Sequence, residues 1–102
     1  MTLNELKSDI KKELRGVGII YDAFMTDDTP AVIIKLDNYL TAKWGITKNY
    51  YLTIYWSDNL RCYVILDDMI DRDTRYYNLT HFFREITQID SLDDIFDNLY
   101  ND

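Results

Sequence analysis

The stretch NYYLTIYWSDNLRCYVIL, residues 49–66, decides the fold class because it reads as two strands joined by a turn. Aromatic, β-branched and other apolar residues fill both halves, and the polar run Ser57-Asp58-Asn59 separates them. A three-residue loop at this run would place Ile54 opposite Cys62 and make one face of the hairpin apolar throughout. We therefore predict an antiparallel hairpin whose core face contains Ile54 and Cys62.

The other face of the predicted hairpin gathers tyrosine and arginine side chains: Tyr51, Tyr55, Arg61 and Tyr63. These two residue types are frequent anchors in protein interfaces. Aromatic platforms also stack nucleobases, but the βαββαβ order of RNA-recognition folds differs from the order predicted here. Two roles stay open for this face. Either helices from elsewhere in the chain cover it, or it is an alternative surface for binding a protein partner.

A helix is predicted at the start of the chain. Thr2 and Glu5 have the spacing of a capping box, and apolar residues follow at helical intervals. Gly16 suits the left-handed residue that often ends a helix. We therefore expect the helix to run over residues 3–15.

Two further strands are predicted between this helix and the hairpin. The runs Val17–Met25 and Ala31–Asp37 flank a turn signal that contains proline. The register that sets Asp22 opposite Lys35 keeps both charges off the core face. That register assigns to the core face Ile19, Tyr21, Ala23, Met25, Val32, Ile34 and Leu36. Residues 38–48 are ambiguous between a loop, a short helix and an irregular continuation of the strand.

After the hairpin, an acidic connector over residues 67–73 leads to two predicted helices. The first begins near Thr74, and its apolar stripe is Tyr76, Leu79, Phe82, Phe83 and Ile86. The second begins at Ser91, and its stripe is Leu92, Ile95, Phe96, Leu99 and Tyr100. The complete prediction is an α+β fold of order α-β-β-β-β-α-α, with an N-terminal helix, an antiparallel sheet of about four strands and two C-terminal helices.

Length and composition predict one domain over residues 1–102 and an ordinary hydrophobic core. The sequence contains no apolar run long enough to span a membrane and no signal-peptide pattern, so no membrane association is expected. Cys62 is the only cysteine, which excludes an intramolecular disulfide and favours a reducing compartment. We therefore expect a cytoplasmic protein.

Negative charge is concentrated in the last third of the chain. Residues 1–66 carry eight acidic and eight basic groups, whereas residues 67–102 carry ten acidic groups and three arginines. The whole net charge of −7 therefore arises after residue 66. Such a field attracts cationic partners and repels nucleic acid, whose binding needs lysine and arginine. Direct nucleic-acid binding is not expected.

Residue patterns that carry chemistry are missing or incomplete. His81 has no partner at a recognisable spacing, and Cys62 falls on the predicted core face, where a thiol is inert. A calcium loop starting at Asp67 would put Arg72 where the turn glycine is needed. No dinucleotide, P-loop, nucleophile-elbow or zinc-protease motif is present. We therefore predict no catalytic residues, no metal and no cofactor, although a small enzyme with a site assembled from distant residues stays a third alternative.

The favoured function is binding through acidic side chains. The candidate partner-binding residues are Asp67, Asp68, Asp71, Asp73, Asp90, Asp93, Asp94 and Asp97. The expected partner is a protein with a basic surface, such as a nucleic-acid-binding enzyme, because carboxylates on a rigid helix approximate an array of phosphates. In general character the chain is similar to small acidic phage proteins that inhibit restriction or CRISPR nucleases, without sharing a family motif. The alternative is an accessory or immunity-type protein that binds through the tyrosine-rich face.

Overall fold

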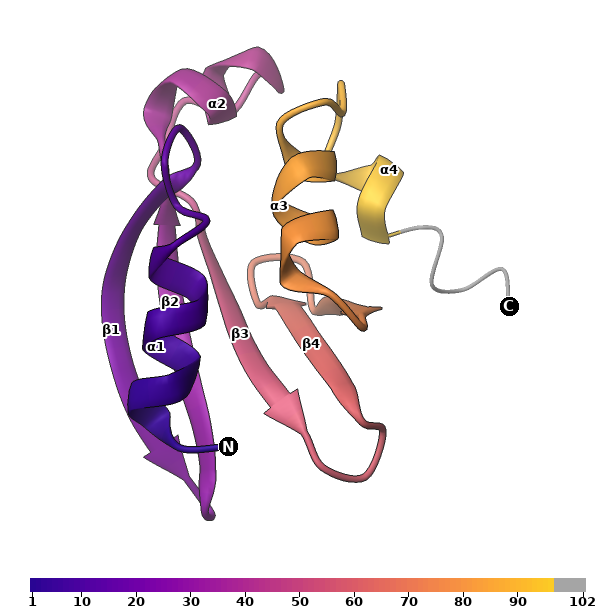
Figure 1. Ribbon diagram of the computed structural model, residues 1–102. Coiled ribbons are helices and arrows are strands. Elements are labelled where there is room, and N and C mark those ends of the chain that lie inside the picture. The colour runs from indigo at the N-terminus through magenta and orange to yellow at the C-terminus, as the bar shows by residue number, and fades with distance from the viewer. Residues whose placement is uncertain (97–102) are drawn as a thin grey trace.

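The computed structural model describes residues 1–96, which form an α+β fold with a five-stranded sheet (Figure 1). The elements are α1 (Leu3–Lys11), β1 (Gly18–Thr26), β2 (Thr29–Leu36), α2 (Asn38–Lys43), β3 (Tyr51–Ser57), β4 (Cys62–Asp67), β5 (Arg72–Tyr76), α3 (Leu79–Ile86) and α4 (Asp93–Phe96). The strands pair antiparallel in chain order, β1-β2-β3-β4-β5. The predicted fold class is confirmed, with five strands rather than four.

Helix α1 begins where the capping box predicts and ends before the predicted boundary. The Thr2 hydroxyl accepts a hydrogen bond from the Glu5 N–H at 3.1 Å, and the Glu5 carboxylate accepts one from the Thr2 N–H at 2.9 Å. The helix stops at Lys11, and a turn follows in which the Leu14 carbonyl accepts from the backbone N–H of Val17 at 2.9 Å. This turn buries both Leu14 and Val17, so core packing ends the helix before residue 15.

Strands β1 and β2 form a hairpin with a tighter turn and another register than predicted. Only Asp27 and Asp28 separate the strands, and both have positive φ, at 47° and 66°, as primed two-residue turns require. A bulge between Ile20 and Asp22 shifts the pairing, so Asp22 lies opposite Ile33 instead of Lys35. The predicted core positions Ile19 and Tyr21 are consequently 60% exposed, as Met25 largely is, whereas Ile20 and Ala23 pack against the core.

Strands β3 and β4 form the predicted hairpin, but its register is wrong by three residues. Ser57 pairs with Cys62, and Ile54 pairs with Ile65 rather than with Cys62. The loop spans residues 58–61, and it closes through a 2.8 Å hydrogen bond from the Arg61 N–H to the Ser57 carbonyl, with Arg61 left-handed at φ 56°. An odd shift exchanges the two faces of β4. Cys62 therefore lies on the face opposite to the helix-covered core.

The connector predicted over residues 67–73 contains the start of a fifth strand. Residues 72–76 form β5, which pairs with β4 and includes Tyr76, a residue predicted to be helical. Helix α3 starts later than predicted because the Asn78 side chain accepts from the N–H groups of Thr80 and His81 and so caps it. Residues 97–102, including part of the second predicted C-terminal helix, lie outside the described residues.

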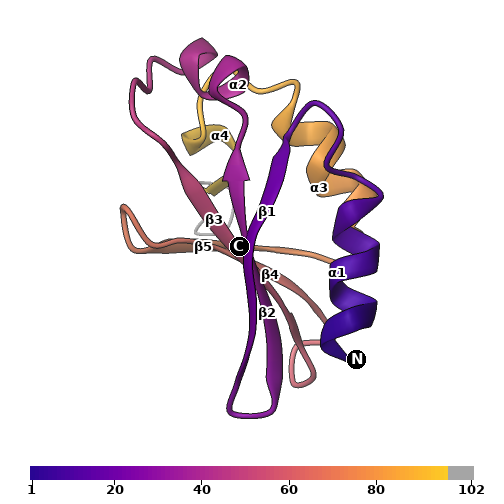
Figure 2. The same cartoon turned by 90° about the vertical axis from the view of Figure 1, so that its left-hand side faces the viewer.

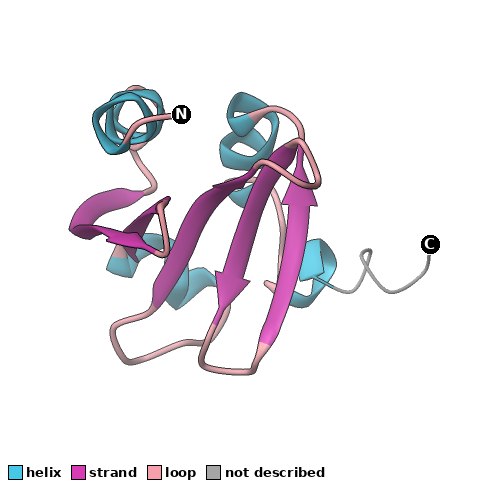
Figure 3. Ribbon diagram, turned by 90° about the horizontal axis from the view of Figure 1, so that it is seen from below, coloured by secondary structure: helices cyan, strands magenta, loops and turns pink. Residues whose placement is uncertain are grey.

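Helices cover one face of the sheet. Figure 2 shows α1 and α3 on the same side of it, and Figure 3 shows the strands from below with the N-terminal helix to one side of them. The core formed there includes Leu6, Ile10, Val32, Ile34, Leu36, Leu52, Ile54, Ile65, Phe82, Phe83, Ile86, Ile95 and Phe96. Helix α2 closes one end, where the Trp44 indole N–H donates to the Ile89 carbonyl at 3.1 Å. The helices therefore bury one face of the sheet, and within residues 1–96 the other face has no covering helix.

Candidate functional site

The face of the sheet away from the core is here called the open face. Cross-strand pairing places on it one row made of Phe24, Ala31, Tyr55, Val64 and Arg75. A second row contains Ile33, Thr53, Leu66 and Asp73. Most of these side chains are only half-buried, and none belongs to the helix-covered core as described for residues 1–96. The open face is thus apolar along its middle and solvent-accessible.

A groove of about 450 Å³ lies on the open face. Its apolar and aromatic lining residues are Phe24, Ala31, Ile33, Tyr55 and Leu66, and its polar ones are Thr26, Thr29, Thr53, Asp27 and Asp68. Small side chains at Ala31 and Thr53 lie among larger neighbours in the two rows, which explains the hollow. Asp27 and Asp68 are the charged residues of this lining, so the groove is an apolar trough with negative charge on its rim.

The four residues of the predicted aromatic face do not share one surface. Tyr51 and Tyr55 lie on the open face, with the Tyr51 ring 4.8 Å from that of Tyr21. Tyr63 lies on the covered face, half-buried, with its ring 5.0 Å from Trp56. Arg61 lies in the exposed turn between β3 and β4. The prediction of one shared face is therefore wrong, because the β3–β4 register places Tyr63 on the covered face.

The eight candidate aspartates are likewise placed in different environments. Asp67 is fully buried, so its assignment to a partner-binding surface is wrong. Asp68 lines the groove, and Asp73 stands half-buried on the open face. Asp71 and Asp90 are exposed, as are Asp93 and Asp94, and Asp97 lies outside the described residues. The structure thus brings Asp68 and Asp73, two of the predicted set, onto the open face.

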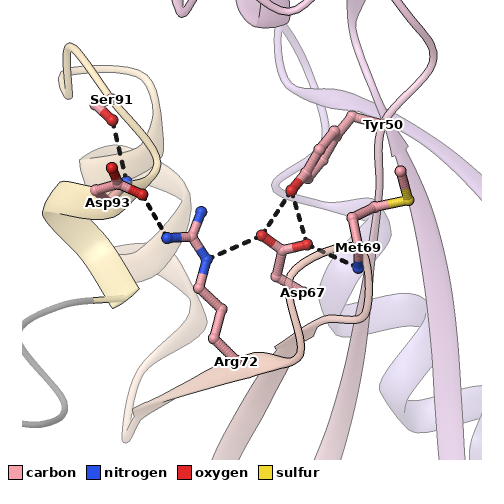
Figure 4. A network of polar contacts seen from close by, with 6 residues as sticks. All are labelled: Tyr50, Asp67, Met69, Arg72, Ser91 and Asp93. Atoms are coloured by element: carbon pink, nitrogen blue, oxygen red, sulfur yellow. Dashed lines mark hydrogen bonds and ion pairs between the residues drawn. The ribbon is translucent and has the colours of Figure 1, made fainter.

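Asp67 is buried because a network of polar groups holds its carboxylate (Figure 4). The Tyr50 hydroxyl lies 2.8 and 2.7 Å from the two carboxylate oxygens, and the Met69 N–H donates at 3.2 Å. Arg72 donates through Nε at 3.0 Å and makes an ion pair with Asp93 through its other end. The guanidinium also lies 4.7 Å from the centre of the Phe96 ring. The network ties β4, β5 and Tyr50, which directly precedes β3, to α4.

The electrostatics of this network fit a structural role. Burial, followed by the hydrogen bond to Asp67, raises the pKa of Tyr50 far above its ordinary value, which keeps the hydroxyl a donor at neutral pH. Burial lowers the pKa of Arg72, but the hydrogen bonds to Asp93 and Asp67 outweigh it, and the net direction is upward. Every buried side-chain polar atom among the described residues has a partner.

A second polar cluster surrounds His81 on α3. Its Nε2 lies 3.5 Å from the Glu85 carboxylate, which also accepts a 2.8 Å hydrogen bond from the Tyr76 hydroxyl. Burial and this hydrogen bond raise the pKa of Tyr76 well above its usual range. The adjoining hollow of about 300 Å³ is lined only by polar residues. His81 is an exposed residue of α3 whose Nε2 lies beside the Glu85 carboxylate.

Other chemistry finds little support in residues 1–96. They contain no cluster of three or more metal-ligating side chains, and Cys62 is buried. None of the helices within these bounds has the length and apolarity to cross a membrane. Comparison of the chain with protein-family models, curated proteins and solved structures found no significant match. The candidate site therefore rests on the geometry of the open face.

Sequence reasoning missed the groove because it depends on register. Phe24, Ile33 and Leu66 lie in strands whose two faces are both apolar, and only the observed pairing places the three side chains together. The sequence did contain one indication of the groove. A hairpin with apolar residues on both faces buries one set of them in the core, and the set on the other face has to pack elsewhere or stay exposed. That excess of apolar residues in β3 and β4 points to a second packing surface.

Proposed function

We propose that this chain is a non-catalytic binding protein that docks through its open face on a positively charged surface of a protein partner. The observation that carries the proposal is the half-buried apolar trough of about 450 Å³ on a sheet face that no helix of residues 1–96 covers. Contiguous apolar surface left in water is typical of interaction sites. An inhibitory effect follows wherever the partner's basic surface is itself used to bind something else.

Charge complementarity favours a cationic partner. The open face carries four aspartates in or beside the strands, against the two cations Lys35 and Arg75; the aspartates are Asp22, Asp27, Asp68 and Asp73. The chain as a whole has a net charge of −7. A negative field of this kind accelerates encounter with a basic surface and disfavours acidic ones. Apolar contacts in the groove would supply most of the binding affinity. The charges would raise the association rate and favour basic partners over acidic ones.

We propose the acidic-surface hypothesis in a reduced form. Asp67 cannot contact a partner because it is buried, and Asp93 is paired with Arg72. The exposed Asp71 and Asp90 are not among the residues that line the groove. A binding surface centred on the groove therefore uses acidic residues as a rim around apolar contacts, rather than as a continuous imitation of nucleic-acid phosphates.

Quantitative affinity capture tests the proposal. The tagged full chain is incubated with a bacterial lysate beside two variants, Tyr55→Ala in the groove and Tyr39→Ala on α2. Tyr39 is 88% exposed and does not line the groove, so it controls for loss of a surface tyrosine. We expect at least one protein whose recovery falls tenfold or more with Tyr55→Ala and is unchanged with Tyr39→Ala. A loss of this size is typical of aromatic interface anchors, whose truncation costs about 2 kcal/mol or more.

The contradicting outcome is equally definite. If every captured protein is recovered equally by wild type and Tyr55→Ala, the open face is not the docking surface. Circular dichroism and thermal unfolding of both variants must first show that each retains the fold. A companion pair, Asp71→Asn and Asp90→Asn, then tests the acidic-surface hypothesis, because selective loss with these two variants would place the interface away from the groove.

A further inference from the structure

We infer that the groove is a recognition site for an extended protein segment that presents an apolar side chain between two basic residues. This inference rests on the proposed function and specifies what the open face selects. The apolar middle of the groove, formed by residues such as Ile33, Tyr55 and Leu66, accepts the anchor. The carboxylates of Asp27 and Asp68 accept the flanking lysine or arginine side chains.

The positions of the two carboxylates set the length of the segment. Asp27 lies in the β1–β2 turn, next to the Thr26–Thr29 pair, and Asp68 directly follows β4 at the opposite end of the sheet. The Thr53 hydroxyl donates to the Asp68 carboxylate at 3.4 Å, so this carboxylate lies near the level of Ile33, the partner of Thr53 on β2. Thr29 and Ile33 differ by four residues, which corresponds to about 13 Å along a strand. Four residues of extended chain also span about 13 Å. The spacing therefore fits basic residues near the two ends of a short extended segment.

The chemistry of the lining explains why both features are needed. The centre offers aromatic and aliphatic surface, and its polar partners are the uncharged hydroxyls of the threonines and of Tyr55. A charged side chain there would lose its hydration without an opposite charge to compensate. Asp27 and Asp68 are exposed, so a cation near them keeps part of its water while gaining an opposite charge. Neutral apolar segments would bind the trough without using the rim, and acidic segments would be repelled from it.

Selection from a random peptide library tests the inference with the full chain. A phage-displayed library is panned on immobilised wild type, and clones that bind Tyr55→Ala equally well are discarded. We expect the remaining peptides to share an apolar residue flanked by lysine or arginine. Synthetic copies are then measured against wild type, Asp27→Asn and Asp68→Asn. Asparagine preserves the shape of the side chain and tolerates the positive φ of Asp27.

Each groove substitution should weaken binding about two- to fivefold at low salt, the effect of one exposed ion pair, and the difference should vanish near 1 M salt. Asp71→Asn and Asp90→Asn are the matched controls, since they remove the same charge from exposed positions outside the groove lining, and they should leave affinity unchanged. Groove-dependent peptides without basic residues, or affinities that Asp27→Asn and Asp68→Asn do not alter, would overturn the inference while the proposed function stands. A library that yields no groove-dependent peptide also overturns it. The proposed function falls as well only if Tyr55→Ala leaves lysate capture unchanged.

Discussion

Replacing Asp67 by alanine should destabilise the fold more than any other removal of a single aspartate among the described residues. The side chain is 0% exposed and accepts hydrogen bonds from the Tyr50 hydroxyl, the Met69 N–H and Arg72 Nε. Its loss would leave the Arg72 side chain, only 11% exposed, with Asp93 as its remaining carboxylate. Removing one partner of a buried ion pair costs about 3–5 kcal/mol.

A loss of that size is a large part of the total stability, which is about 5–15 kcal/mol for a domain of this kind. Since each kcal/mol lowers the melting temperature of such a domain by about 4–8 °C, Asp67→Ala should melt at least about 12 °C below wild type. Urea unfolding followed by the fluorescence of Trp44 and Trp56 measures the free energy directly. Asp68→Ala, the exposed neighbour, is the control and should change it by no more than about 0.5 kcal/mol. A loss below about 1 kcal/mol for Asp67→Ala would refute the reasoning that the network holds the sheet to α4.

Three further predictions concern other parts of the fold. Gly18→Ala should cost about 2 kcal/mol or more in urea unfolding, because the new Cβ would lie 2.1 Å from the Lys35 carbonyl oxygen; a cost below about 0.5 kcal/mol would show that the strands can separate there freely. Thr2→Ala removes the capping box and should cost about 1 kcal/mol, measured in the same way. The pKa of Tyr76 is raised by burial and by Glu85, so its contribution to stability is complete below the unfolded pKa of about 10 and is lost as the pH rises above it; Tyr76→Phe should make stability fall less steeply in that alkaline range, and an unchanged slope would contradict the assignment.

Local sequence signals predicted most of the fold, because each depends on a few neighbouring residues. The capping box of Thr2 and Glu5 set the start of α1, and the polar run after Trp56 separated β3 from β4. The fifth strand was missed because DRDTRY, residues 71–76, is rich in charge. Charged residues are common in edge strands, and β5 lies at the edge of the sheet. Its polarity therefore reflects its position rather than a loop.

Register could not be predicted because burial did not discriminate between the alternatives. In β4, both Cys62 with Val64 and Tyr63 with Ile65 are apolar pairs, so either set could have faced the core. The bulge after Ile20 has no glycine or other marker in the sequence. Since the groove is made by residues from several strands brought together by these registers, the candidate site could be found only in three dimensions.

Contact between the open face and a partner can be seen residue by residue in amide chemical-shift mapping of the labelled full chain, titrated with the first partner whose capture depends on Tyr55. If the open face binds, the largest shifts fall on its strands around Thr53, Tyr55 and Leu66, with little change along α1 and α3. Shifts confined to α4 and the preceding loop around Asp90, with none in β2 to β4, would show that the partner binds elsewhere.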